Sequence, residues 1–154
     1  MDNIVETVNY SEGIIALWQE AFGDSREDVL FFLNNAVNKS CLCRFDGNKL
    51  CSMLFLVDCT VNSVNYKYIY AACTAKEYRK YGYMSELLKY CQSKYSHVLL
   101  IPANEELVSY YNKRNFNHKV NICNIVFNET GEIKDYLFEG CSLKEPFALA
   151  YKGE

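Results

Sequence analysis

The sequence has little positive charge and no long apolar run, and both shortages exclude classes of protein. Its formal net charge is −3, whereas proteins that bind nucleic acids are usually basic. No apolar run approaches the roughly 20 residues that a membrane-spanning helix needs. Residues 1–6 are acidic rather than basic and lack the pattern of a secretory signal peptide. We therefore expect a cytoplasmic protein that binds neither nucleic acid nor a membrane.

The sequence also has only two histidines and no Cys-x-x-Cys pair, although it has eight cysteines. Structural zinc sites usually combine such pairs with further cysteine or histidine ligands, so we expect no metal site. A free cysteine behaves as a small hydrophobic residue, and in a reducing cytosol we expect all eight to pack as buried thiols. Cys73 lies on the strand that leads into the turn before Gly82, but a packing role is favoured there too.

The composition is that of one folded domain. The chain has 154 residues, of which 50% are hydrophobic and 15% aromatic, values that argue against disorder. A chain of this length can bury one sizeable core but is short for two. Since it contains no repeat, low-complexity tract or linker, we predict a single domain, residues 1–154.

Hydrophobic periodicity predicts the order of strands and helices. The predicted strands are residues 4–8, 41–45, 49–61, 66–74, 98–101 and 120–127, with one more near 149–151. The predicted helices run from 11 to 23, from a cap at 24–28 to about 37, from 83 to 95 and from 104 to 114, and 129–131 form a turn. Three strands joined by hairpins form an antiparallel meander. We therefore predict an α+β fold with three layers, a mixed, mainly antiparallel sheet of six to seven strands with about four helices on its two faces.

Residues 68–91 are the most informative stretch, because a short apolar strand leads through a polar turn into a helix. The first N–H groups of a helix have no partner within it, and the helix dipole places partial positive charge there. Gly82 allows the backbone to approach a ligand closely, and Arg79 and Lys80 add two cations beside the same turn. The stretch could therefore bind a phosphate or diphosphate, although a glycine between a strand and a helix is more often a simple turn.

The spacing within this turn is specific. Arg79-x-x-Gly82-x-Met84 resembles the pyrophosphate-binding motif of the GNAT superfamily of acyl-CoA-dependent N-acyltransferases, Arg/Gln-x-x-Gly-x-Gly/Ala. Met84 stands where that motif has a small residue. The resemblance covers about residues 10–127.

A second motif of the same superfamily follows at the expected distance. It consists of an asparagine, a tyrosine seven residues later and a Tyr-x-x-x-Gly-Phe pattern. In this sequence the positions are Asn104, Tyr111 and Phe116, with Asn115 in place of the glycine. Asparagine is the next best residue after glycine for a left-handed conformation at a helix C-terminus.

The resemblance implies that the fourth and fifth strands of the sheet diverge and that acetyl-CoA binds as co-substrate between them. It implies that Tyr111 is the general acid that protonates the leaving thiolate. The implied cofactor-binding residues are Cys73, Thr74, Ala75, Arg79, Lys80, Tyr81, Gly82, Tyr83, Met84 and Asn104. Asn104 has an equally good interpretation as the N-cap of its helix.

The function implied is transfer of an acetyl group from acetyl-CoA to the amine of a small molecule or peptide, by direct attack in a ternary complex. The first two helices could supply aromatic side chains to the acceptor pocket, namely Trp18, Phe22, Phe31 and Phe32. The sequence does not identify the general base, which could be Glu20, Asp24, Asp28, Glu77, Glu105 or a chain of water molecules.

Two other functions remain open at this point. One is a non-catalytic module or sensor of the same fold that binds acyl-CoA. The departures from the family motifs at Met84 and Asn115 favour this alternative. The other is a thiol-redox or metal protein, which only the number of cysteines suggests. The sequence also leaves the acceptor undetermined, as well as the choice between a monomer and a homodimer.

Overall fold

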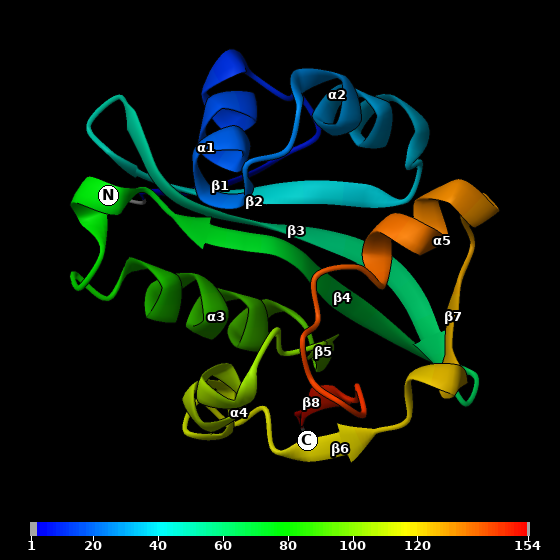
Figure 1. Ribbon diagram of the computed structural model, residues 1–154. Coiled ribbons are helices and arrows are strands. Elements are labelled where there is room, and N and C mark those ends of the chain that lie inside the picture. Colours follow the sequence, from blue (N-terminus) through cyan, green and yellow to red (C-terminus); the bar gives the residue numbers. More distant parts are fainter. Residues whose placement is uncertain (1–2, 154) are drawn as a thin grey trace.

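The computed structural model describes residues 3–153, and within them it contains eight strands and five α-helices (Figure 1). The strands are β1 (Ile4–Thr7), β2 (Lys39–Asp46), β3 (Lys49–Val61), β4 (Val64–Thr74), β5 (His97–Leu100), β6 (His118–Val120), β7 (Ile125–Phe127) and β8 (Ala148–Lys152). The helices are α1 (Glu12–Phe22), α2 (Arg26–Asn35), α3 (Tyr83–Lys94), α4 (Glu105–Asn112) and α5 (Gly131–Leu137). Two single 3₁₀ turns, Lys76–Tyr78 and Ile122–Asn124, complete the regular structure.

The strands form one sheet in the order β1-β2-β3-β4-β5-β8-β6, and β7 pairs with the end of β3. Six of its seven pairings are antiparallel, and only the pairing of β4 with β5 is parallel. The predicted mixed, mainly antiparallel sheet with helices on both faces is therefore confirmed, with one strand and one helix more than expected.

β3 is the centre of the sheet, and its sequence explains why. Residues 51–57 are all buried, as expected for a strand covered on both faces. Because successive side chains of a strand point to opposite faces, Met53 and Phe55 enter one core cluster whereas Leu54 and Leu56 enter the other.

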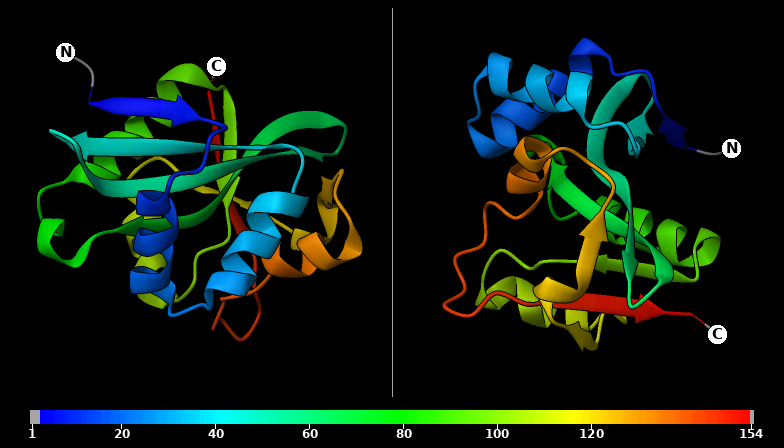
Figure 2. Two further views of the ribbon diagram at one scale, coloured as in Figure 1. Left: turned by 90° about the horizontal axis from the view of Figure 1, so that it is seen from above. Right: turned by 90° about the vertical axis from the view of Figure 1, so that its right-hand side faces the viewer.

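The helices divide between the two faces accordingly. α1, α2 and α5 bury their apolar side chains in the cluster of Met53 and Phe55, and α3 and α4 bury theirs in the cluster of Leu54 and Leu56. Figure 2 shows the resulting three layers from two further directions.

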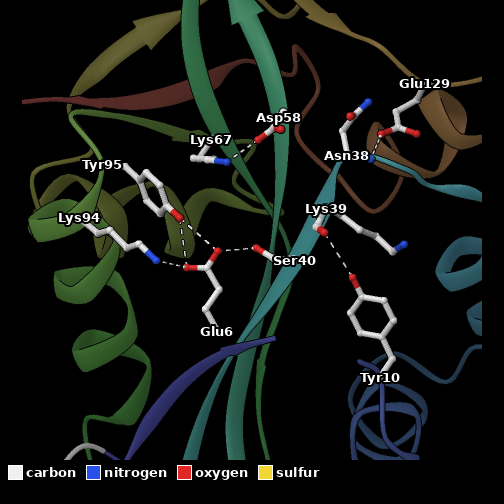
Figure 3. Close-up of polar contacts among 10 residues, drawn as sticks. All are labelled: Glu6, Tyr10, Asn38, Lys39, Ser40, Asp58, Lys67, Lys94, Tyr95 and Glu129. Carbon is white, nitrogen blue, oxygen red and sulfur yellow. Dashed lines mark hydrogen bonds and ion pairs between the residues drawn. The ribbon is translucent and has the colours of Figure 1, made fainter. Parts of the chain in front are cut away.

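The edge strand β1 is attached to α3 by a polar network around Glu6 (Figure 3). The Glu6 carboxylate accepts hydrogen bonds from Ser40 Oγ at 2.8 Å, Lys94 Nζ at 2.9 Å and the Tyr95 hydroxyl at 3.1 Å. Burial alone would raise the pKa of Glu6, but these hydrogen bonds outweigh it, so that its pKa lies below the ordinary value.

The prediction of one strand over residues 120–127 is wrong. β6 ends at Val120, the 3₁₀ turn at 122–124 intervenes, and Asn121 caps this turn by accepting a hydrogen bond from the backbone N–H of Cys123. β6 pairs with β8, whereas β7 pairs with β3. The chain has to break here because the two short strands join different parts of the sheet.

The predicted turn at 129–131 is in fact the start of a helix that the sequence analysis missed. The Thr130 hydroxyl accepts a hydrogen bond from the N–H of Ile133 and so caps α5. Ile133 and Leu137 bury that helix against α2. The Glu129 carboxylate accepts hydrogen bonds from the N–H groups of Val37 and Asn38, both at 2.9 Å, which ties the start of α5 to the end of α2.

The cysteines are all free thiols, and six of them are buried as predicted. Cys123 is exposed and Cys141 is half-buried, so the expectation that all eight are buried fails at these two positions. Both lie in irregular or 3₁₀ segments rather than on a strand or an apolar helix face. Within residues 3–153, no group of three histidine, cysteine or acidic side chains is arranged to hold a metal ion, and no helix is long and apolar enough to cross a membrane.

Candidate active site

The sheet divides between β4 and β5. These parallel strands share only the register pairs Lys67–Val98 and Tyr68–Leu99, and within the described chain residues 69–74 of β4 have no register partner on β5. β5 ends two residues before Pro102, which has no N–H to donate to a ladder. One edge of the second half of β4 is therefore left without a neighbouring strand.

A cavity of about 400 Å³ occupies this division (we call it the central cavity). It is lined by Trp18, Phe22, Asp24, residues 68–72 of β4, Leu100, Ile101, Ala103, Leu107, Tyr111, Glu139 and Gly140. These residues come from α1 and the loop after it, from β4, from β5 and the loop after it, from α4 and from the segment after α5, so the cavity reaches both faces of the sheet.

A β-bulge at Ala71 and Ala72 bends β4 beside the central cavity. Tyr70 pairs with Phe55 and Cys73 pairs with Met53, so β4 has one residue more than β3 in this interval. Ala71 has a φ of 54°, a left-handed conformation that costs a residue with a side chain about 1 kcal/mol or more. Such bulges redirect backbone groups, and here they do so at the wall of the cavity.

Beyond the end of β4, the chain makes the turn that the sequence analysis singled out. Gly82 is the N-cap of α3 with a φ of 78°, and Lys80 also has a positive φ of 75°. Among residues 3–153, no side chain caps the N-terminus of α3, so its first N–H groups remain available for an anion. The Arg79 side chain is fixed by a hydrogen bond from its Nε to the carbonyl oxygen of Thr74 at 3.2 Å.

A second cavity, of about 360 Å³, lies at this turn (we call it the anion pocket). It is lined by Thr74, Tyr78, Arg79, Lys80, Gly82, Tyr83, Met84, Ser85, Tyr110 and Arg114. Three cationic side chains and a free helix N-terminus thus meet in one hollow without an acidic side chain among its lining residues, a composition suited to phosphate groups.

Arg114 was missed by the sequence analysis although it lies inside the second motif. Its Nε donates a hydrogen bond to Ser85 Oγ at 2.9 Å, its Nη1 donates one to the Tyr110 carbonyl oxygen at 2.9 Å, and its guanidinium lies 3.5 Å from the centre of the Tyr110 ring. These contacts hold a cation from the end of α4 beside the first turn of α3.

The predicted cofactor-binding residues fall into two groups. Thr74, Arg79, Lys80, Gly82, Tyr83 and Met84 line the anion pocket. The other four do not line it: Cys73 and Ala75 are buried, Tyr81 is 66% exposed, and Asn104 lies at the start of α4. The Asn104 Oδ1 accepts a hydrogen bond from the N–H of Leu107 at 2.9 Å, which is the N-cap interaction.

Cys73 has the environment of a structural residue. Burial, together with the nearby carboxylate of Glu20, raises the pKa of its thiol to about 12. Because only the thiolate is a good nucleophile, this cysteine is not suited to covalent chemistry at neutral pH.

Tyr111 lines the central cavity from α4 and is only 8% exposed. Burial raises the pKa of its phenol to about 12, with a smaller contribution from Tyr110. The second motif also fixes the local backbone. Asn115 adopts the left-handed conformation with a φ of 71°, and the N–H of Phe116 then donates a hydrogen bond back to the Tyr111 carbonyl oxygen at 3.1 Å.

The other end of the central cavity carries two carboxylates, Asp24 and Glu139. Asp24 is one of five candidate bases, and of these it alone lines the cavity within the described chain. Glu20 accepts a hydrogen bond from the N–H of Lys76, and Glu77 pairs with Lys49. Glu139 was missed because it follows the unpredicted helix α5 in a segment without a motif.

The aromatic residues of the first two helices are likewise divided. Trp18 and Phe22 line the central cavity. Phe32 is fully buried in the core, and Phe31 stacks on Tyr136 with ring centres 5.6 Å apart. Tyr70, which the sequence analysis did not consider, also lines the cavity.

The fold and the two cavities describe an α+β protein with a site for an anionic ligand, and comparison with known proteins identifies the family. Residues 7–119 match the family model described as an acetyltransferase (GNAT) domain. The chain belongs to the GNAT superfamily, as its two motifs predicted. A search of curated proteins gives no significant match.

Solved structures agree with this assignment at the level of the fold. A Bacillus subtilis acetyltransferase in complex with CoA is 13% identical, with a TM-score of 0.64 and 97% of each chain covered. A GNAT family acetyltransferase from Elizabethkingia anophelis with acetyl-CoA bound is 15% identical, with a TM-score of 0.58 and 99% of each chain covered. Arabidopsis thaliana NAA60 in complex with a bisubstrate analogue is 15% identical, with a TM-score of 0.63 and 98% of each chain covered.

Proposed function

We propose that the protein is an N-acetyltransferase that transfers the acetyl group of acetyl-CoA to an amine in a ternary complex. The observation that carries the proposal is the division of the sheet after Tyr68 and Leu99, which leaves one edge of β4 free between the anion pocket and the central cavity. Structures of the same fold that contain CoA or acetyl-CoA support the choice of co-substrate.

The anion pocket would hold the diphosphate of the co-substrate. The free N–H groups at the start of α3, together with Arg79, Lys80 and Arg114, supply donors and positive charge. Gly82 lets the phosphate oxygens reach the backbone, since a Cβ built there would have no protein atom within 4 Å and would occupy the open space of the pocket. Tyr83 and Met84 line the pocket and would border the phosphates, and Tyr81 would approach them from its exposed position at the rim.

The pantetheine arm would follow the free edge of β4, along Cys73, Thr74 and Ala75, toward Asn104 at the start of α4. An extended amide chain can add to a free strand edge through backbone hydrogen bonds. The thioester would then lie in the central cavity between the bulge at Ala71 and the side chain of Tyr111.

The chemistry needs three groups around that thioester. The amine nitrogen attacks the carbonyl carbon, and a free backbone N–H of β4 near the bulge stabilises the developing oxyanion. The C–S bond breaks as the C–N bond forms, and Tyr111 donates its proton to the leaving sulfur. A phenol is protonated at neutral pH even at its ordinary pKa of about 10, and burial raises the pKa of Tyr111 to about 12, so the proton is available to the sulfur. The end of the cavity that Asp24 and Glu139 line would receive the amine (we call it the acceptor end). One of these carboxylates, or water, takes the proton that the amine loses.

Acetyl transfer can be tested by incubating the protein with acetyl-CoA and phenethylamine, spermidine, glycine or a peptide with a free N-terminus. Thiol release measured together with the mass of the acetylated amine would support the proposal. Tight binding of acetyl-CoA without transfer to any amine would instead support the alternative, a non-catalytic acyl-CoA-binding module of the same fold.

A further inference from the structure

The acceptor end of the central cavity is negatively charged. Asp24 lies in the loop between α1 and α2, and Glu139 lies just after α5, and both line the cavity. Among the described residues that line it, none is a lysine, arginine or histidine. Tyr70 lines the same cavity, and the two carboxylates add to burial in raising the pKa of its phenol.

The Asp24 carboxylate is held in place before any ligand binds. Gly23 ends α1 in a left-handed conformation with a φ of 72°, which turns the chain at Asp24. Trp18 Nε1 then donates a hydrogen bond to Asp24 Oδ2 at 2.8 Å. A carboxylate accepts about four hydrogen bonds over two oxygens, so capacity remains for a ligand.

The Glu139 side chain is exposed, and none of the ion pairs among residues 3–153 includes it. Its negative charge is therefore not compensated by a neighbouring cation. A ligand that brought a further negative charge into the cavity would be repelled by both carboxylates, whereas an ammonium group would be attracted.

The wall next to these carboxylates is aromatic. Trp18 packs edge-on against Tyr70 with ring centres 5.7 Å apart and against Phe55 at 5.3 Å. Trp18 is itself buried, and Phe22 completes the same wall at the surface. Aromatic faces attract both apolar groups and cations, and the cavity of about 400 Å³ must also admit the thioester. The space that remains suits a small acceptor.

We propose that the acceptor is a small cationic amine with an apolar or aromatic body and without an acidic group, and that Asp24 and Glu139 select it. This inference rests on the proposed acetyltransferase function. It excludes amino acids as preferred acceptors, because their carboxylate is bonded to the carbon that carries the amino group and would come close to Asp24 and Glu139 when these attract the ammonium group.

Phenethylamine and phenylalanine form a suitable pair of probes, since they differ only by the carboxylate. Calorimetric titration of each into the protein saturated with CoA measures acceptor binding without turnover. We expect phenethylamine to bind at least tenfold more tightly. Equal binding of the two probes, tighter binding of phenylalanine, or no binding of either would overturn the inference.

Variants connect the preference to the two carboxylates. Glu139→Gln and Asp24→Asn should each weaken phenethylamine binding and reduce the ratio of the two affinities severalfold. Glu27→Gln removes an exposed carboxylate of α2 that does not line the cavity, and it should leave the ratio unchanged. If Asp24→Asn does not fold, the test rests on Glu139→Gln alone. An unchanged ratio of the phenethylamine and phenylalanine affinities in that variant would contradict selection by these carboxylates.

The failure of this inference can be distinguished from failure of the proposed function. Absence of acetyl-CoA binding and transfer would refute the acetyltransferase. Acetyl-CoA binding together with faster acetylation of phenylalanine than of phenethylamine would refute only the acceptor class.

Discussion

Tyr68 and Leu99 form the last register pair between β4 and β5. Up to this pair the two strands belong to one continuous sheet, and beyond it β4 continues to Thr74 with a free edge. Pro102 on one side and the bulge at Ala71 on the other both oppose further pairing. The proposed co-substrate site therefore follows from local backbone features that the sequence encodes.

Gly82 should be needed for acetyl-CoA binding more than for folding. Gly82→Ala forces alanine into a left-handed conformation, as does Gly47→Ala in the β2–β3 turn, where φ is 60°. We expect each variant to lose about 1 kcal/mol of unfolding free energy in urea titrations. Only Gly82→Ala should lose acetyl-CoA affinity, by tenfold or more, since Gly82 lines the anion pocket and Gly47 does not. If Gly82→Ala and Gly47→Ala bound acetyl-CoA with equal affinity, the phosphates would not approach the backbone at Gly82.

Tyr111 should act in the chemical step. Tyr111→Phe removes the hydroxyl at the central cavity while keeping the ring, so we expect kcat to fall roughly 100-fold with acetyl-CoA affinity nearly unchanged. Tyr90→Phe is the matched control, because Tyr90 lies on α3 and lines neither cavity. A Tyr111→Phe protein that turns over at the wild-type rate would remove this residue from the mechanism.

The Glu6 network should make stability depend on pH. The pKa of Glu6 is lowered from its ordinary value of 4.5 in the folded state. The contribution of the Glu6 carboxylate to the unfolding free energy is therefore fully present above pH 4.5 and is lost as the pH falls through the folded-state pKa. We expect Glu6→Gln to lower the unfolding free energy by about 1–2 kcal/mol at pH 7 and by progressively less below pH 4.5.

Chemical denaturation of the wild type and Glu6→Gln at several pH values measures this dependence. Glu27→Gln, at an exposed position without an ion pair among the described residues, serves as control. A difference between wild type and Glu6→Gln that stays constant from pH 7 to pH 3 would show that the carboxylate does not need its charge.

Local sequence signals predicted the parts of the fold that depend on local chemistry. The bounds of β3 were predicted to the residue because its apolar run lies between a Gly47 turn and an Asn62 turn. Asn115 was predicted to be left-handed, and it is. Gly82 was predicted at a strand-to-helix turn, and it is the N-cap of α3.

Features of the fold that depend on contacts between distant parts of the chain could not be predicted from the sequence. Residues 120–127 alternate like one strand, and only the separate pairing of β6 with β8 and β7 with β3 reveals the break. α5 has seven residues and begins at a Thr-Gly pair that also suits a turn. The acceptor end joins Asp24, Tyr70 and Glu139, which are far apart in the chain, so no spacing rule could connect them.

Calorimetric titration with acetyl-CoA is the most direct test of the proposed co-substrate site. We expect the wild type to bind with micromolar affinity and Arg79→Glu to lose at least tenfold, because a cation of the anion pocket becomes an anion. Lys89→Glu, which makes the same charge change at an exposed position of α3 outside the pocket, should bind like the wild type. A wild type that does not bind acetyl-CoA, or an Arg79→Glu variant that binds as tightly, would contradict the site.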